Sequence, residues 1–417
     1  MHRIRPSRAP WLFSQYTQTG KCNLMTRNET VRKSGFRLPS LSLSLVALSL
    51  AVAQPAFALC DSVTVTSHAE LEAAVVDYNT NCADGSTLTA TVNGTINVAS
   101  VLPVNNSTSA KLEILGDGDD ILDGMDSSQI LSIVDGIVIL ETMILQNGNG
   151  SAAGFGGALE IFGSADVTVN NTTLTGNQAP NAGAISSTGT LTITNSTFNN
   201  NASNPSQSSA IQVEGGGETL IINSTFSNNQ SGSLGTVSAL GAGTILTITN
   251  CTLSGNIAGL GVGGNLVSGL SAEVNVNNTI LANSTSDGTT PISDCFVQSA
   301  AVNFSSNVSN IVENGGQCGT PGTDYIQADP QLDSLGDNGG SIQTMKLLLG
   351  SPGIDAGDNA LAVDKDSNPL MNDGRGPGFP RIFHGTVDLG AYENMEVPVE
   401  IMTFEIVQVE AVQPFRR

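Results

Sequence analysis

Two glutamates have the residue type and spacing for acid–base chemistry. Glu160 and Glu214 lie in or just after equivalent strand segments, two sequence repeats apart. Hydrolysis of a glycosidic bond requires two carboxyl groups about 5 to 10 Å apart. Parallel strands are spaced by about 4.8 Å, so two repeats would separate these carboxyl groups by about 10 Å. The pair is a candidate for an inverting hydrolase, and the alternative is that both are solvated strand residues.

A run of aspartates offers oxygen atoms of the kind that Ca²⁺ binds. The candidate ligands are Asp117, Asp119, Asp120 and Asp123. Their spacing is not that of an EF-hand loop or of the glycine-rich nonapeptide repeat. A corner between two repeats is the alternative interpretation, and the sequence indicates no other metal or cofactor.

Four cysteines form two pairs that are close in sequence. The expected disulfides are Cys60–Cys82 and Cys295–Cys318. Each would close a loop of a little over 20 residues and stabilise the fold by about 3 kcal/mol. Cys251 stands where another repeat copy has Ser196, so we expect a free, structural thiol there.

An internal repeat determines which elements would position these side chains. The pattern Asn-x-Thr-apolar-x-x-Asn occurs five times, and a small-residue pattern recurs every 26 residues. Copies of the first pattern are 171–177, 195–201, 223–229, 250–256 and 277–283, and copies of the second begin at Gly157, Gly183, Ser209 and Gly235. Each repeat contains three short strands separated by Asn and Gly, which tolerate the left-handed backbone of sharp corners.

A coil of about 26 residues with three strands and three corners is one turn of a parallel β-helix. Like side chains then lie above one another, so we expect Phe198 and Phe226 to stack inside the coil. The last Asn of each copy is expected to form a ladder of amide hydrogen bonds. Its members would be Asn177, Asn201, Asn229, Asn256 and Asn283. A β-propeller, the alternative, has a longer repeat of about 40 to 50 residues.

The N-terminal segment has the features of a secretory signal peptide. A basic stretch precedes an apolar run, 38–57, and a small-x-small pattern ends at Ala58. Ser, Gln and Pro interrupt the run, which argues against a membrane-spanning helix. We therefore expect export of the chain, as a secreted or cell-surface protein of bacterial type, with disulfides permitted.

The charge balance excludes several classes of partner. The 15 basic and 37 acidic residues give a formal net charge of −22 at pH 7. Binding to nucleic acid, or to a membrane surface through a basic stripe, is therefore not expected.

A short helix is predicted after the leader, where Ser67 and Glu70 form a capping box. Its expected apolar face comprises Leu71, Val75, Val76 and Tyr78. The ends of a β-helix need covering, so we expect this helix to lie over the N-terminal coil.

Two resemblances to known families extend this interpretation over roughly residues 60–393. The motifs at 156–159, 198–201 and 226–229 resemble the Gly-Gly-Ala-Ile and Phe-x-x-Asn repeats of the chlamydial polymorphic outer membrane proteins. The whole looks like a right-handed β-helix of the pectin-lyase-like superfamily. The C-terminal third carries ordered motifs: Asp329-Pro330, Asp337-Asn338-Gly339-Gly340, Gln343-Thr344, Gly350-Ser351-Pro352, Ile354-Asp355-Ala356-Gly357, Asp373-Gly374-Arg375-Gly376, Arg381 and Asp388 to Glu393. These are similar to the choice-of-anchor Q domain of exported bacterial proteins.

The sequence lacks several residues that the resembled families use for catalysis or metal binding. Met345 follows the Gln-Thr pair where the domain usually has His, so a metal or acid–base role of that His is absent. Lyases of the superfamily commonly use Arg or Lys as base, with Ca²⁺ on carboxylates. Between residues 38 and 345 the sequence has no Arg, one Lys, Lys111, and one His, His68 in the predicted helix. The tail from Val397 is too short and too polar for a membrane anchor.

We interpret the chain as an all-β, right-handed parallel β-helix with added ends. The expected parts are a signal peptide (1–58), an N-terminal cap and first strands (59–110), the β-helix (111–320), an irregular anchor-Q-like module (321–393) and a tail (394–417). The expected function is that of an exported, non-catalytic, adhesin-like or structural protein that binds an extracellular polysaccharide or a surface protein. The alternative is a polysaccharide hydrolase or lyase with carboxylates on one β-helix face.

Overall fold

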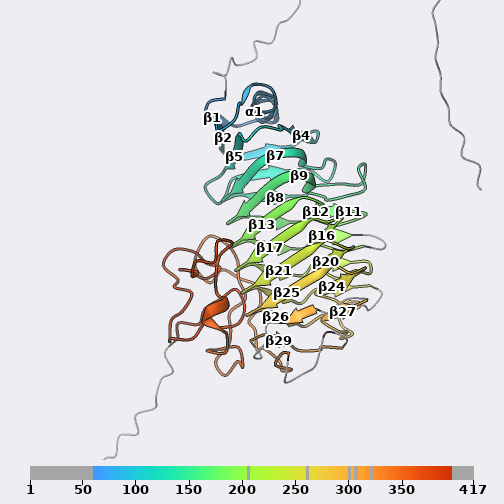
Figure 1. The fold of residues 1–417 in the computed structure, drawn as a ribbon, viewed down its shortest axis with the longest axis vertical. Coiled ribbons are helices and arrows are strands. Elements are labelled where there is room, and N and C mark those ends of the chain that lie inside the picture. Colours follow the sequence, from blue (N-terminus) through green and yellow to red (C-terminus); the bar gives the residue numbers. More distant parts are fainter. Residues whose placement is uncertain are drawn as a thin grey trace, which may run out of the picture. The chain divides into compact units, whose positions relative to one another are not determined.

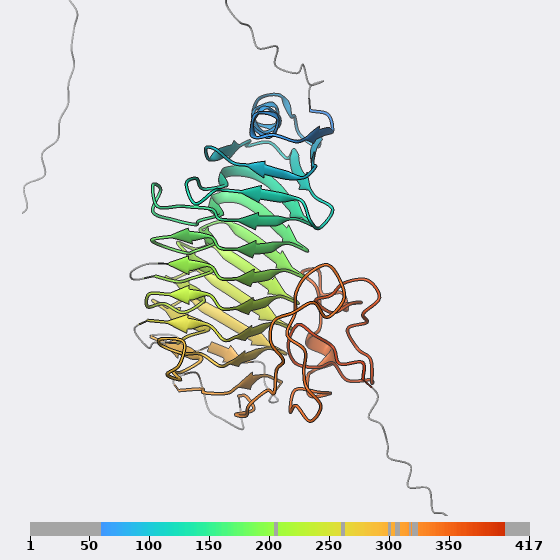
Figure 2. The ribbon, with the colours of Figure 1, turned by 180° about the vertical axis from the view of Figure 1, so that it is seen from behind.

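The computed structural model describes residues 60–203, 207–259, 263–298, 302–304, 309–316, 318 and 324–396. Over these residues the chain winds as a right-handed parallel β-helix of about nine turns (Figures 1 and 2). This confirms the all-β fold class expected from the repeat. The predicted signal peptide and the tail from residue 397 lie outside the described residues.

Three parallel sheets form the walls of the coil. The 16-stranded sheet comprises β1 (Val63–Val65), β2 (Thr87–Val92), β4 (Leu102–Asn105), β5 (Lys111–Leu115), β7 (Leu131–Glu141), β9 (Leu159–Asn170), β12 (Ile185–Ser187), β13 (Thr190–Thr194), β16 (Ile211–Glu214), β17 (Glu218–Ile222), β20 (Val237–Leu240), β21 (Ile245–Thr249), β24 (Leu266–Gly269), β25 (Glu273–Asn277), β27 (Cys295–Val297) and β28 (Val302–Phe304). The nine-stranded sheet comprises β3 (Thr95–Asn97), β6 (Ile121–Asp123), β8 (Ile144–Gln146), β10 (Thr173–Thr175), β14 (Thr197–Asn199), β18 (Thr225–Ser227), β22 (Thr252–Ser254), β26 (Ile280–Ala282) and β29 (Ile311–Val312). The four-stranded sheet comprises β11 (Gln178–Ala179), β15 (Ala202–Ser203), β19 (Gln230–Ser231) and β23 (Ile257–Ala258).

The strand register follows the 26-residue spacing of the small-residue pattern. Leu159 pairs with Ile185, which pairs with Ile211 and so on to Val237. A small residue is required before each of these strands because neighbouring turns approach closely. A Cβ on Gly157, for example, would lie 2.3 Å from the carbonyl oxygen of Gly183. The four-stranded sheet was not predicted, because two-residue strands carry no readable periodicity.

Apolar side chains fill the interior of the coil. Alternate residues of each strand point inward, so the Leu, Ile and Val side chains of successive turns stack. Phe198 and Phe226 are fully buried and their rings stack, with centroids 4.6 Å apart and planes 9° apart. The predicted aromatic stack inside the coil is confirmed.

Helix α1 (His68–Asn81) covers the N-terminal end of the coil (Figure 1). The Ser67 side chain accepts a hydrogen bond from the Glu70 N–H (3.4 Å). Glu70 Oε2 accepts from the Thr66 N–H (2.7 Å), and this bond lowers the pKa of Glu70. The predicted apolar face is wrong at Val76, which is 53% exposed; Ala74 takes its place, because it lies on the same side of the helix as Leu71.

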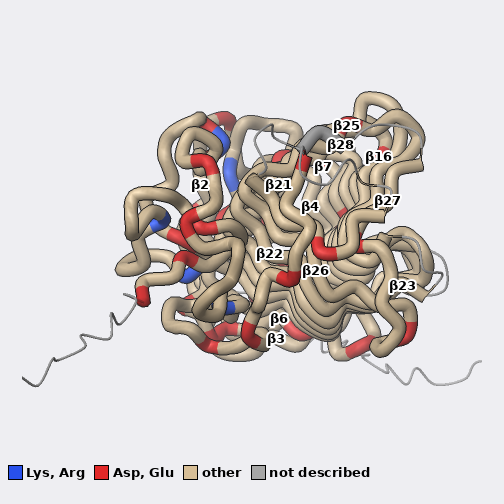
Figure 3. The backbone as a smooth tube through the Cα atoms, turned by 90° about the horizontal axis from the view of Figure 1, so that it is seen from below, with Lys and Arg blue, Asp and Glu red and all other residues tan. Residues whose placement is uncertain are grey.

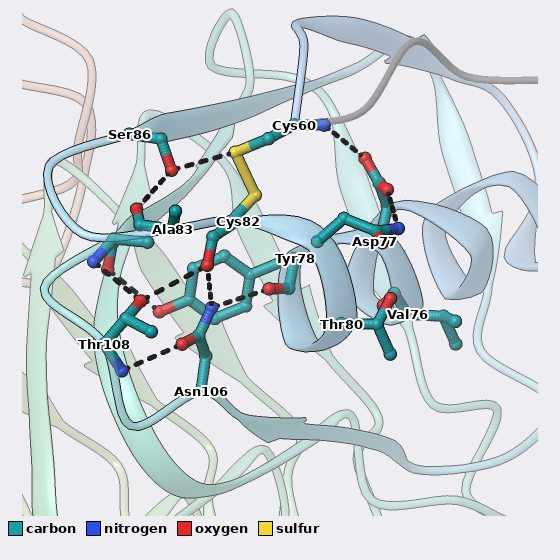
Figure 4. Close-up of a disulfide and its surroundings, with 12 residues drawn as sticks. Cys60, Val76, Asp77, Tyr78, Thr80, Cys82, Ala83, Ser86, Asn106 and Thr108 are labelled. Carbon is teal, nitrogen blue, oxygen red and sulfur yellow. Dashed lines mark hydrogen bonds between the residues drawn. A yellow bond between two sulfur atoms is a disulfide. The ribbon is translucent and has the colours of Figure 1, made fainter.

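The first expected disulfide joins this helix to the strand region before it (Figure 4). Cys60 and Cys82 are bonded, and the Cys60 N–H donates to Asp77 Oδ2 (2.8 Å). Asn106 Nδ2 donates to the carbonyl oxygens of Tyr78 (2.6 Å) and Cys82 (3.2 Å), which ties the end of α1 to the coil. Within the described ranges, no helix is both long enough and apolar enough to cross a membrane.

The second disulfide, Cys295–Cys318, lies at the other end of the coil. Cys251 is free and fully buried, as expected, and burial raises the pKa of its thiol to about 12. Its Sγ accepts from the Ser224 N–H (3.4 Å), in the place that a serine hydroxyl takes in the preceding turns.

Residues 324–396, here called the C-terminal segment, are mostly irregular and pack against the side of the coil (Figure 2). The segment contains a 3₁₀ turn, η1 (Asn359–Leu361), and short antiparallel bridges. It bonds directly to the coil: the Ala391 N–H donates to Thr252 Oγ1 (3.0 Å), and Asn278 Nδ2 donates to the Asp358 carbonyl oxygen (2.9 Å).

Two buried ion pairs stabilise the C-terminal segment internally. Arg375 pairs with Asp373 (2.6 Å), and Arg381 pairs with Glu393 (3.0 Å). The Arg375 guanidinium also lies 3.9 Å from the ring centre of Tyr392. A buried guanidinium is tolerated when its N–H groups are paired and its face contacts an aromatic ring.

Candidate functional site

A column of left-handed residues forms the corner between the 16-stranded and nine-stranded sheets. Asn adopts this backbone conformation more readily than other residues with a Cβ. The column comprises Thr142, Asn171, Asn195, Asn223, Asn250 and Asn278, with φ angles between 47° and 59°. The strand register stacks these residues turn above turn, so their side chains form a continuous polar stripe.

Amides at this corner are joined head to tail. Asn223 Nδ2 donates to Asn195 Oδ1 (3.3 Å), and Asn195 Nδ2 donates to Asn170 Oδ1 (3.3 Å). Asn170 Nδ2 donates to Glu141 Oε1 (2.9 Å). At the other end, Arg381 Nη1 donates to Asn223 Oδ1 (3.4 Å). We call these five residues the corner ladder, in which every donor points from the guanidinium toward the carboxylate.

Two cavities lie between this side of the coil and the C-terminal segment. The first, of about 420 Å³, is lined by the four coil residues of the corner ladder and by Met371, Asn372 and Pro377. The second, of about 400 Å³, is lined by Gln146, Thr175, Asn199, Asp337 and Gln343. Ser341 lines both cavities, and its hydroxyl contacts Asn171 Oδ1. We call the two cavities together the cleft.

The cleft offers amides, hydroxyls and two carboxylates. Glu141 and Asp337 are the charged side chains among its lining residues. Met371 is 77% exposed and provides an apolar surface beside the amides. Acidic positions outnumber basic ones in the view along the coil (Figure 3). Such a lining suits an uncharged or cationic ligand that has many hydroxyl groups and some apolar surface.

The two predicted glutamates lie outside the cleft, on the outer face of the 16-stranded sheet. Glu160 pairs with Ser186, which pairs with Gln212, so Glu214 stands two residues farther along its strand. The Cα atoms of the two glutamates are therefore about 12 Å apart, two turns and two residues removed. Gln212 Nε2 donates to Glu214 Oε2 (2.9 Å). Burial raises the pKa of Glu160.

Three of the four predicted calcium ligands lie together. Carboxylate oxygens of Asp117, Asp119 and Asp120 are within 4.8 Å of one another. Asp120 is buried, and its oxygens accept from the N–H groups of Gly94 (2.5 Å) and Asp117 (2.9 Å), as in a corner cap. Asp123 lies outside this group and accepts from Gln146 Nε2 (2.7 Å). Asp120 therefore has a structural role that needs no ion, and calcium binding by the group stays a hypothesis.

The last asparagines of the repeats form a second, buried ladder. Asn177, Asn201 and Asn229 each donate through Nδ2 to the Oδ1 of the next member, at 2.9 to 3.0 Å. Each Nδ2 also donates to a backbone carbonyl oxygen of the preceding turn. All of these side chains are fully buried, so the bonds form away from water.

The prediction that Asn283 is the fifth member of the buried ladder is wrong. Strand pairing of Thr252 with Ile280 places Ser284 in the ladder position, one residue later than the sequence alignment gives. Asn283 is exposed and bonds to Ser254 Oγ (3.0 Å). Because the serine side chain is short, Asn256 Nδ2 donates instead to Asn265 Oδ1 (2.8 Å).

The buried ladder ends on a carboxyl group that the sequence did not single out. Asn265 Nδ2 donates to Asp294 Oδ1 (3.2 Å), and the Asn314 N–H donates to Asp294 Oδ2 (2.7 Å). Burial raises the pKa of Asp294 to about 7. Asp294 lies next to Cys295 of the second disulfide, and no repeat pattern includes it.

No match is found when the chain is compared with models of known protein families, with curated proteins or with solved structures. The site must therefore be interpreted from its own geometry.

Proposed function

We propose that this protein is an exported, acidic β-helix protein that binds an extracellular polysaccharide in the cleft, in an adhesin-like or structural role and without catalysis. The parallel β-helix and the two disulfides fit an exported protein. The family assignments belong to this proposal too: a pectin-lyase-like β-helix with a choice-of-anchor Q module, and a leader that directs export.

The cleft is the observation that supports this proposal most strongly. Hydrogen-bonding groups recur along the corner ladder about every 4.8 Å, the spacing of stacked turns. Asn195 keeps one N–H and one lone pair for a ligand after its ladder bonds are counted, and Asn170 keeps one N–H. Asn223 is buried, and both of its N–H groups are already used. Met371 and Pro377 supply apolar surface for the faces of sugar rings. A polymer with repeated hydroxyl groups meets all of these conditions.

The alternative function is a carbohydrate-active enzyme. Burial raises the pKa of Glu160, which is the property of a proton donor at neutral pH. The Cα atom of Glu160 lies about 12 Å from that of Glu214, and an inverting pair requires that the two carboxyl groups approach to about 6.5 to 9.5 Å. A glycan-binding screen that also scores cleavage products, run with Ca²⁺ and with chelator, distinguishes the two functions.

The cleft is tested by removing one ladder amide. Asn195→Gly should lower polysaccharide affinity at least tenfold, because two ladder bonds and the amide facing the cleft are lost. Asn200→Gly is the control, because Asn200 also has a left-handed backbone but is exposed and lines neither cavity of the cleft. Affinities are measured by calorimetry with the best polysaccharide from the screen.

Either of two results would contradict the proposal. Equal affinity in Asn195→Gly and in the native protein would remove the cleft as the binding site. Release of shorter oligosaccharides would replace binding by catalysis, and Glu160 would then be the first residue to examine. The melting temperatures of both variants serve as the folding control.

A further inference from the structure

We propose that the cleft selects saccharides that bear amino groups, and that Glu141 binds the ammonium group. This inference rests on the proposed function, because it names the ligand class of the same cleft. The ladder amides are uncharged, so the Glu141 carboxylate at the end of the corner ladder is the group that can distinguish a charged ligand from a neutral one.

The Glu141 carboxylate is held in place by one hydrogen bond but can still accept others. Its Oε1 accepts one bond, from Asn170 Nδ2 (2.9 Å), and Oε2 has no hydrogen-bond partner among the described residues. The side chain is half-buried and lines the first cavity. A half-buried carboxylate attracts a cation more strongly than one in open water, because the surrounding medium is less polarisable.

The cation of the corner ladder does not neutralise this carboxylate. Arg381 stands at the opposite end, three amides away, and its charge is already paired with Glu393 (3.0 Å). No described Lys or Arg is among the lining residues of either cavity. The negative charge of Glu141 is therefore available to a ligand.

The carboxylate of Asp337 also favours a cationic ligand in the cleft. Asp337 lines the other cavity and is exposed. With a formal net charge of −22 on the chain, a polysaccharide of uronic acids would be repelled from the cleft. An ammonium group on a sugar would be attracted and would fill the open position on Glu141 Oε2.

The experiment compares two tetrasaccharides that differ only in charge: glucosamine tetramer and N-acetylglucosamine tetramer. Calorimetry at a mildly acidic pH keeps the amino groups protonated. We expect the amino tetramer to bind about fivefold more tightly at low salt, and this ratio to fall toward one at about 0.5 M NaCl. In Glu141→Gln the ratio should approach one at low salt, since the Gln carbonyl oxygen still accepts the bond from Asn170.

Glu218→Gln is the matched control, because Glu218 is an exposed acid of the same sheet that does not line the cleft. This variant should keep the fivefold ratio. Equal binding of the two tetramers to the native protein would overturn the inference, and so would a ratio that survives in Glu141→Gln. If the N-acetylated tetramer binds as tightly as the amino tetramer, this inference is wrong but the proposed function stands. If neither tetramer nor any polysaccharide of the screen binds, the proposed function is wrong as well.

Discussion

Asp294 is a single residue on which the stability of the last turns depends. Its carboxyl group is fully buried, and the negative charge of Glu313 also disfavours its ionised form. Burial raises the pKa of Asp294 from 3.8 to about 7. The folded protein therefore keeps this proton between about pH 4 and pH 7, where the unfolded chain has lost it. Stability from this group is present at low pH and is lost as pH rises through about 7.

We therefore expect the native protein to lose stability between about pH 4 and pH 7, by an amount on the order of 4 kcal/mol from this residue, and no further above pH 7. Asp294→Asn should flatten that part of the pH profile. The variant loses its bond from the Asn314 N–H, so the slope with pH, and not the absolute stability, is the quantity to compare. Denaturant unfolding at several pH values measures it. An unchanged slope in the variant would show that Asp294 does not titrate in this range.

At the scale of the elements, the buried ladder connects successive turns through side chains as well as through strands. Asn201 accepts from the N–H (3.1 Å) and from Nδ2 (3.0 Å) of Asn177, and its own Nδ2 donates to Leu174 O and Asn229 Oδ1. None of these partners has access to water, so each one left without a bond costs free energy.

Asn201→Ala should accordingly lower the free energy of unfolding by about 1 to 3 kcal/mol. Asn283→Gly is the informative control. Asn283 was expected in the same ladder but lies outside it, and Gly suits its left-handed backbone. The control should change stability by less than about 0.5 kcal/mol. Similar losses in both variants, measured by chemical denaturation, would argue against the buried ladder as a special source of stability.

At the scale of the whole described fold, the C-terminal segment and the coil share the corner ladder. Arg381 is fully buried; it bonds to Asn223 of the coil and pairs with Glu393 of its own segment. The segment therefore forms one wall of the cleft and also terminates the ladder that lines the other wall.

Arg381→Ala should destabilise the protein by about 3 kcal/mol, because Glu393 would be left buried without its cation. We expect the C-terminal segment to become sensitive to protease before the coil does. Lys365→Ala is the control: the pair of Lys365 with Asp366 is well exposed on both sides and should contribute almost nothing. Resistance to proteolysis equal to that of the native protein would contradict a central role for Arg381.

The coil could be predicted from local sequence patterns, because a β-helix repeats one local arrangement. Spacing of the small-residue pattern gave the strand register from Leu159 to Val237, and the pairing of nearby cysteines followed from their position at irregular stretches. The stacking of Phe198 on Phe226 needed only the knowledge that equivalent positions lie above one another. Local signals sufficed because every turn contacts the next in the same way.

Tertiary structure alone decided the features that break the repeat. Asn283 lies outside the buried ladder because one extra residue shifts the register of the last copy. The ladder ends instead on Asp294, which belongs to a loop without any repeat pattern. The cleft likewise depends on where a segment without periodicity docks, which brings Arg381 to Asn223, 158 residues earlier in the chain. Such contacts are set by the packing of two dissimilar surfaces, and no spacing in the sequence encodes them.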